Sequence, residues 1–320
     1  MRHCLASKTL PAIPFAPIHE WTKARINTEC GLAYRRYERG LREHYVSYFN
    51  QRPWLQDASQ SHSAISMSAA LPPGWNQLER LLPRSAIHPH ARSAKSSQTL
   101  SLALLGGALS IDPSLNWFRD AFEIEWPFTD RTARASFERE LSRSDLNEEP
   151  HTTQLDFAAE DSSCFVAIES KWCERGFDVC SCLRRSEGTH LPGGYCSERV
   201  LNRPRYWEAA RDFFGLPPER LPLLPCQIAP LYQVLRNVAA ARQLAGVSRA
   251  FGFVLLYDES NPYFRPTGSW PGWPAVLRTH LESNKSPRFC FRAIAWQKLI
   301  TRLPLDVNIR RWARIKHRLY

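Results

Sequence analysis

The segment QLDFAAEDSSCFVAIESKW, residues 154–172, carries the strongest structural signal in this chain. Residues 154–158 and 165–172 are rich in β-branched, aromatic and other apolar residues and predict two strands, while Asp161 and the two serines after it predict a turn. A turn centred between Ser162 and Ser163 places Asp156 directly opposite Glu169, with both side chains on one face of the sheet. Lys171 follows Glu169 by two residues and shares that face. The hairpin therefore predicts two carboxylates and one amine in one place.

Two carboxylates that face each other destabilise a sheet unless something compensates their charge. A Mg²⁺ ion does so naturally, because it is held by one or two carboxylates together with waters and phosphate oxygens. Lys171 could then orient or help to deprotonate an attacking water, or stabilise charge in the transition state. Phe165 and Ala167 share the face of Glu169 and are apolar, which disfavours the alternative of a solvated salt-bridge cluster.

Asp156 followed by Glu169-Ser170-Lys171 on an apolar strand resembles the PD-(D/E)XK superfamily of restriction-endonuclease-like proteins. Other segments resemble a bacterial branch of this group, namely HPHARSAKSSQ (88–98), TQLDF (153–157), AIESKW (167–172), YQVLRN (232–237) and the terminal segment 296–320. The resemblance implies that Asp156 and Glu169 bind Mg²⁺, with Mn²⁺ as a substitute. It also implies that the main-chain carbonyl of Ser170 joins them and that Lys171 is catalytic.

The chain departs from the superfamily pattern at two positions. Leu155 replaces the proline that names the motif. Gln98 stands where some members supply a metal-binding glutamate, and Glu123 or Glu125 is a possible substitute. Gln98 remains a candidate for substrate binding.

Apolar periodicity predicts the elements around the hairpin. We expect a helix at 26–49 with Arg35, Arg36, Arg39 and Arg42 on its outer face, and a buried helix at 99–105 that ends at Gly106-Gly107. The remaining predictions are a strand at 122–126, a charged helix at 133–141, helices at 204–214 and 230–244, a buried strand at 251–257, and helices at 296–302 and 309–317.

This order matches the αβββαβ core of restriction-endonuclease-like proteins. The predicted fold class is α/β, with a mixed central sheet flanked by helices and with N- and C-terminal helical extensions. We divide the chain into an N-terminal extension with an amphipathic helix (1–85), a nuclease core (86–260), and a C-terminal loop with helices packed on the core (261–320).

A polar stripe of Gln233, Arg236 and Asn237 lies opposite the apolar face of the predicted helix at 230–244. One interpretation places Gln233 near the metal and Arg236 near a substrate phosphate. The other is a solvated helix face.

Four cysteines follow the second strand of the hairpin, at positions 173, 180, 182 and 196. Together with His190 they could hold zinc or an iron–sulfur cluster, but their spacing is not a standard one, and free thiols are the favoured interpretation. The chain has nine cysteines, an odd number, which disfavours a fully paired disulfide scaffold.

The charge of the chain favours a polyanionic partner. Its 42 Lys and Arg residues exceed its 31 Asp and Glu residues, for a net charge of +11, which suits nucleic acid first and an anionic membrane surface second. Because the longest apolar stretch (102–111) is too short for a bilayer and prolines interrupt the N-terminus, we expect a cytoplasmic protein that is not bound to a membrane, with a homodimer possible.

The sequence therefore predicts a Mg²⁺-dependent nuclease that acts on DNA. The alternatives are a non-catalytic DNA-binding or assembly protein that retains the nuclease fold, and a zinc-bearing interaction module built on the cysteine loop.

Overall fold

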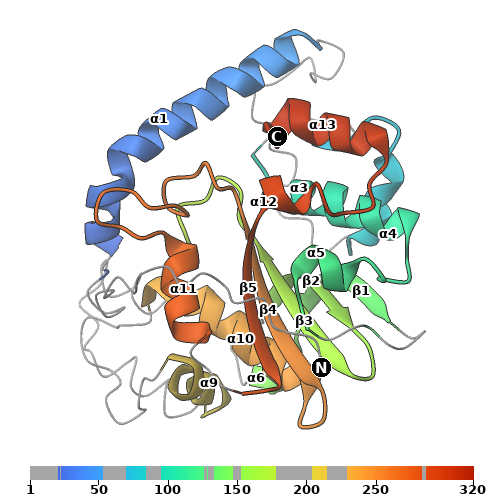
Figure 1. Cartoon of the computed structure of the whole chain (residues 1–320), viewed down its shortest axis with the longest axis vertical. Coiled ribbons are helices and arrows are strands. Elements are labelled where there is room, and N and C mark those ends of the chain that lie inside the picture. The colour runs from blue at the N-terminus through green and yellow to red at the C-terminus, as the bar shows by residue number, and fades with distance from the viewer. Residues whose placement is uncertain are drawn as a thin grey trace, which may run out of the picture.

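The computed structural model of the chain describes residues 21, 23–52, 70–83, 95–125, 128, 133–146, 153–177, 204–214, 229–282 and 286–320. Its centre is a five-stranded mixed sheet in the order β1-β2-β3-β4-β5 (Figure 1). The first three strands are antiparallel, and the last two run parallel to β3. The strands are β1 (Arg134–Glu140), β2 (Gln154–Glu160), β3 (Cys164–Ser170), β4 (Ala250–Tyr257) and β5 (Phe289–Ala295). The predicted fold class, α/β with a mixed sheet flanked by helices, is confirmed.

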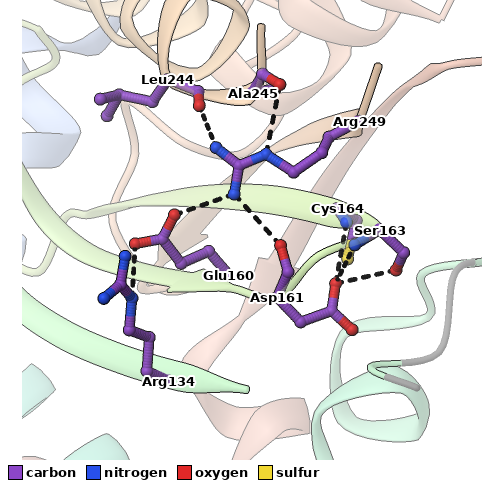
Figure 2. A network of polar contacts seen from close by, with 8 residues as sticks. All are labelled: Arg134, Glu160, Asp161, Ser163, Cys164, Leu244, Ala245 and Arg249. Carbon is purple, nitrogen blue, oxygen red and sulfur yellow. Dashed lines mark hydrogen bonds and ion pairs between the residues drawn. The ribbon is translucent and has the colours of Figure 1, made fainter. Parts of the chain in front are cut away.

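The β2–β3 hairpin has the register that its turn predicts. Phe157 pairs with Ile168 and Ala158 pairs with Ala167, so the next position places Asp156 opposite Glu169. Asp161 fixes the turn, because its Oδ1 accepts hydrogen bonds from the Ser163 amide at 2.7 Å, the Ser163 hydroxyl at 2.8 Å and the Cys164 amide at 2.9 Å (Figure 2).

Arg249 ties the same hairpin tip to the end of helix α10 (Tyr232–Ala245), as Figure 2 shows. Its Nη1 donates to Glu160 Oε2 at 3.0 Å and to the carbonyl of Asp161 at 3.1 Å, while its other nitrogens donate to the carbonyls of Leu244 and Ala245. The arginine thus joins the helix that covers the sheet to the turn that sets its register.

Helices cover both faces of the sheet (Figure 1). One face holds Phe165, Ala167 and Leu255 against α10, α9 (Pro204–Phe214) and α11 (Trp273–Leu281). Val234, Leu235 and Val238 of α10 are buried there, together with Leu231 in the short 3₁₀ turn (Ala229–Leu231) that leads into the helix. The four-residue α6 (Arg143–Leu146) also contacts α10.

The opposite face carries a larger apolar cluster. Its helical elements include α3 (Ser97–Ser101), the π-helical segment η5 (Leu102–Gly106), α4 (Gly107–Ile111), α5 (Phe118–Phe122), α12 (Trp296–Leu299), α13 (Val307–His317) and the 3₁₀ helix η3 (Asn76–Leu81). The predicted helices at 296–302 and 309–317 are confirmed in α12 and α13.

The long helix α1 (Lys23–Asn50) lies along one end of the molecule (Figure 1). The Tyr34 hydroxyl donates to the carbonyl of Cys173 at 2.6 Å, and the Tyr37 hydroxyl donates to the carbonyl of Trp172 at 3.3 Å. The helix therefore holds the segment that leaves β3. The four arginines predicted for its outer face are exposed.

Two predicted elements are wrong. The strand predicted at 122–126 is not formed: Phe122 ends helix α5 (Phe118–Phe122), Glu123 caps that helix in a left-handed conformation with φ 53°, and residues 123–125 are in no strand. Residue 126 lies outside the described residues. Residues 134–140 form strand β1 rather than a helix. Phe137 packs on Phe157 of β2 with a ring-centroid distance of 4.9 Å, so pairing with β2 overrides the charged, locally helix-like pattern.

The buried helix was predicted to end at Gly106-Gly107, but it continues to Ile111. A Cβ on Gly107 would lie 2.6 Å from Ile309 Cδ1, so this glycine permits the close approach of α13. The sequence pattern also missed β5 and α11, which lie in the segment 261–320. The division of the chain into three segments stays a prediction.

No helix in the described part of the chain is long and apolar enough to cross a membrane.

Candidate active site

The hairpin brings its acidic residues and its lysine together. Asp156 lies on β2 and is half-buried, while Glu169 on β3 is fully buried. Asp156 Oδ2 accepts a hydrogen bond from the main-chain amide of Ser170 at 2.7 Å. Lys171 Nζ lies 2.7 Å from Glu169 Oε1. This carboxylate oxygen is buried and, apart from the ion pair, accepts no hydrogen bond from the described residues.

Helix α10 adds two amide side chains to this group. Asn237 Nδ2 donates to Glu169 Oε2 at 2.5 Å, and Lys171 Nζ donates to Gln233 Oε1 at 3.0 Å. Arg236 Nε donates to Thr153 Oγ1 at 3.0 Å, just before β2 begins. Asn237 is only 1% exposed, so the polar stripe is not a solvated helix face at this position.

Glu138 on β1 is a third carboxylate at the site, and the sequence analysis missed it. It stands between the pairs Phe137–Phe157 and Arg139–Leu155, which places it opposite Asp156. Its φ of 51° is left-handed, an uncommon and strained conformation for a non-glycine residue in a strand. Its carboxylate Oε1 accepts from Gln98 Nε2 at 2.5 Å.

The glutamates expected as substitutes for Gln98 lie elsewhere. Glu123 Oε1 pairs with Arg302 Nη1 at 2.6 Å and with Lys298 Nζ at 3.1 Å, and Glu125 Oε1 lies 3.8 Å from Arg292 Nη2. Because the strand 134–140 was predicted as a helix, no sequence signal pointed to Glu138.

The carboxylates perturb one another. Burial raises the pKa of Asp156 well above its usual value, and the charges of Glu169 and Glu138 add to this effect. Burial, together with the charge of Glu169, raises the pKa of Glu138 to about 7 against the opposing hydrogen bond from Gln98. Burial alone would lower the pKa of Lys171, but Glu169, Glu174 and Asp156 outweigh it, so the lysine stays protonated. Three carboxyl groups thus share one ammonium group, and a bound cation would favour the ionised form of each carboxyl.

These residues face a cleft of about 950 Å³. All of the residues predicted for the site line it: Gln98, Asp156, Glu169, Ser170, Lys171, Gln233 and Arg236. Lys23, Lys95 and Arg175 line it as well. The cleft therefore combines an acidic centre with basic side chains around it.

The donor set fits Mg²⁺. The described residues contain no group of three or more His, Cys, Asp and Glu side chains arranged to hold a metal ion by themselves. Mg²⁺ does not require one, because it keeps several waters and binds through one or two carboxylates. A divalent cation would compensate the carboxylates of this site, where three carboxyl groups share the single ammonium group of Lys171.

The cysteine loop contributes one described residue. Cys173 is a free thiol, and its Sγ lies 3.4 Å from the carbonyl oxygen of Lys95. Cys180, Cys182, Cys196 and His190 lie outside the described residues, so the favoured interpretation of free thiols stays a prediction.

A five-stranded mixed sheet with helices on both faces and an acidic cleft at its central hairpin defines an α/β protein with a restriction-endonuclease-like fold. Residues 35–319 match the family model described as Restriction Endonuclease associating with ARP, and the chain belongs to this family. Comparison with curated proteins and with solved structures gives no match.

Proposed function

We propose that this protein is a Mg²⁺-dependent nuclease of the PD-(D/E)XK type that hydrolyses phosphodiester bonds in DNA. The observation that carries the proposal is the convergence of Asp156, Glu169 and Lys171 in one cleft, with the Lys171 ammonium 2.7 Å from the buried Glu169 Oε1. Membership of a restriction-endonuclease family supports it.

Asp156, Glu169 and the main-chain carbonyl of Ser170 would hold the cation, with Mn²⁺ as a substitute for Mg²⁺. The bound ion supplies Lewis acidity to the scissile phosphate and eases deprotonation of the attacking water. Lys171, held between Glu169 Oε1 and Gln233 Oε1, can orient that water and stabilise negative charge on the phosphoryl oxygens. The hydrogen bond from the Ser170 amide fixes one Asp156 oxygen and leaves the other for the cation.

Basic residues around the cleft suit a DNA backbone. Lys23, Lys95, Arg175 and Arg236 line the cleft, and the chain carries a net charge of +11. The affinity for DNA should fall steeply as salt concentration rises, because each neutralised phosphate releases counterions. An affinity that stays constant between low and physiological salt would contradict this part of the proposal.

The direct test is incubation of the purified protein with supercoiled plasmid and with linear DNA, each in Mg²⁺, in Mn²⁺ and in EDTA. We expect cleavage in both metals and none in EDTA. Binding without cleavage in any metal would favour the alternative of a non-catalytic DNA-binding protein. Cleavage that persists in EDTA would contradict metal dependence.

A further inference from the structure

A second cavity, of about 680 Å³, lies on the other side of the segment that follows β3. Lys171 lines the active-site cleft, whereas its neighbour Trp172 lines this second cavity. The cavity opens where β4 ends, at Asp258, and α1 and the end of α13 form its other walls. The carboxyl ends of parallel strands are a recurrent position for ligand sites in α/β proteins.

Three arginines from distant parts of the chain line this cavity: Arg36 on α1, Arg265 after β4 and Arg318 at the end of α13. All three are exposed, and none of their guanidinium groups has a hydrogen-bond or ion-pair partner among the described residues. Guanidinium groups that repel one another gain from a shared anion. Their convergence from three elements therefore indicates an anion site.

Two carboxylates also line the cavity, and they do not cancel this charge. Asp258 is fully buried and accepts from the Tyr37 hydroxyl at 2.7 Å, from Gln297 Nε2 at 2.6 Å and from the Ser260 hydroxyl at 2.7 Å. Its hydrogen-bonding capacity is therefore largely used inside the protein. Glu259 is exposed. Three guanidinium groups thus face one side-chain carboxylate that is open to solvent, that of Glu259.

His317 supplies a second, independent observation. It lines the cavity, is 2% exposed, and its Nε2 has no hydrogen-bond partner among the described residues. Its Nδ1 lies 2.9 Å from the Tyr45 hydroxyl, which accepts from Trp172 Nε1 at 3.1 Å. When Tyr45 donates its proton to Nδ1, a neutral His317 carries its own proton on Nε2. A buried donor without a partner costs free energy, and a ligand oxygen would satisfy it.

We propose that this second cavity binds a phosphate monoester group. Guanidinium groups recognise phosphate through paired hydrogen bonds, and three of them from separate directions suit a group with three terminal oxygens better than a planar carboxylate. The volume falls within the range of small-ligand sites, so the phosphate can belong to a mononucleotide or to the phosphorylated 5′ end of a nucleic-acid strand. The site does not depend on the nuclease function proposed above.

The test is calorimetric titration of the full-length protein in EDTA, so that no cleavage occurs. The titrants are inorganic phosphate, adenosine monophosphate, and a short single-stranded oligonucleotide with either a 5′-phosphate or a 5′-hydroxyl. Tighter binding of the mononucleotide identifies a free nucleotide as the ligand, and a preference for the 5′-phosphorylated oligonucleotide identifies a strand end. If neither phosphate nor any phosphate monoester binds saturably, the proposal is wrong.

A pair of double variants separates the cavity from general charge. Arg36→Gln with Arg318→Gln removes two cavity arginines, whereas Arg39→Gln with Arg314→Gln removes two exposed arginines from the same helices or their ends, neither of which lines the cavity. The first variant should bind phosphate monoesters at least about tenfold more weakly, because it loses charge-assisted hydrogen bonds, and the second should bind as the wild type does. Equal losses in both would overturn the proposal. Arg265→Gln tests the third cavity arginine by itself and should also weaken the binding of phosphate monoesters.

Discussion

The main-chain amide of Ser170 donates a hydrogen bond of 2.7 Å to Asp156 Oδ2, across the two strands of the β2–β3 hairpin. This contact connects the two halves of the proposed metal site through the backbone. It holds Asp156 in place even though burial and the charges of Glu169 and Glu138 oppose its ionisation. The geometry of the site therefore depends on the hairpin register and not on a bound ion.

Asp156→Asn and Glu169→Gln should each abolish metal-dependent cleavage while the fold is kept. The amide oxygens can still accept from the Ser170 amide and from Asn237. We expect each variant to lose more than about 100-fold in activity, beyond what changes around metal ligands usually cost. Cleavage of plasmid in Mg²⁺ measures the loss, and DNA binding in EDTA should be retained or tightened. Asp120→Asn, an exposed substitution on α5, is the matched control; an equal loss there would contradict the assignment.

Lys171→Ala should separate catalysis from metal binding. The lysine pairs with Glu169 Oε1 and lies near Asp156, so its removal makes the site more negative. Cleavage should fall by about 100-fold or more, in the range seen when one electrostatic donor is lost. Affinity for Mn²⁺, measured by calorimetry, should stay the same or increase. A large decrease in that affinity would show that Lys171 organises the metal site and has no separate catalytic role.

Glu138→Gln should stabilise the protein in EDTA and weaken its response to Mg²⁺. The variant removes one of three mutually repelling carboxylates, and the amide oxygen can still accept from Gln98. We expect a melting temperature in EDTA that is higher by a few degrees, consistent with about 1 kcal/mol for a domain of this size. Thermal unfolding with and without Mg²⁺ measures both effects. Glu79→Gln, an exposed change on η3, serves as the control. An unchanged melting temperature and an unchanged response to Mg²⁺ would show that Glu138 is not part of the proposed metal site.

Asp161→Ala should destabilise the protein more than an equivalent change in an exposed turn. Asp161 is 5% exposed and its Oδ1 accepts three hydrogen bonds at the hairpin tip (Figure 2). We expect a loss of about 2 kcal/mol, because buried donors are left unpaired. Asp112 also accepts from the amide of Ser114, at a more exposed position, and Asp112→Ala should cost less than half as much. Urea unfolding measures the stability of both variants. Equal losses of stability would contradict the proposed contribution of the Asp161 hydrogen bonds at the hairpin tip.

Lys316→Met should stabilise the protein, and more at low pH than at high pH. Lys316 is 1% exposed, its Nζ donates to the carbonyl of Ala70 at 2.7 Å, and burial lowers its pKa from 10.5 to about 7. Because the folded-state pKa is depressed, stability is lost as pH falls from 10.5 to 7, and the whole cost is present below pH 7.

We therefore expect the free energy of unfolding of the variant to exceed that of the wild type by roughly 1–3 kcal/mol at pH 6, reduced by the contribution of the lost hydrogen bond. At pH 10 the two proteins should be almost equally stable. Urea unfolding of both proteins at pH 6, 8 and 10 gives the difference at each pH. A gain that does not change with pH would mean that Lys316 is charged, or neutral, throughout this range in the folded state.

The sequence by itself determined the features that depend on local chain properties. The turn at Asp161, between two apolar strand segments, fixes the hairpin register, and with it the opposition of Asp156 and Glu169. Helical periodicity similarly identified α1 and α10, because one face of each helix is buried along its length.

Tertiary structure decided what depends on partners that are distant in the chain. Residues 134–140 became a strand only because β2 offers a pairing edge, and that pairing brings Glu138 to the site. The ion pair of Lys171 with Glu169 is local, but the hydrogen bond from Asn237 requires α10 to pack on β3. The second cavity draws Arg36, Arg265 and Arg318 from three separate elements. Short-range sequence patterns constrain the backbone dihedral angles and determine which face of each helix or strand is apolar. The packing of these apolar faces on one another then decides which charged groups come into contact.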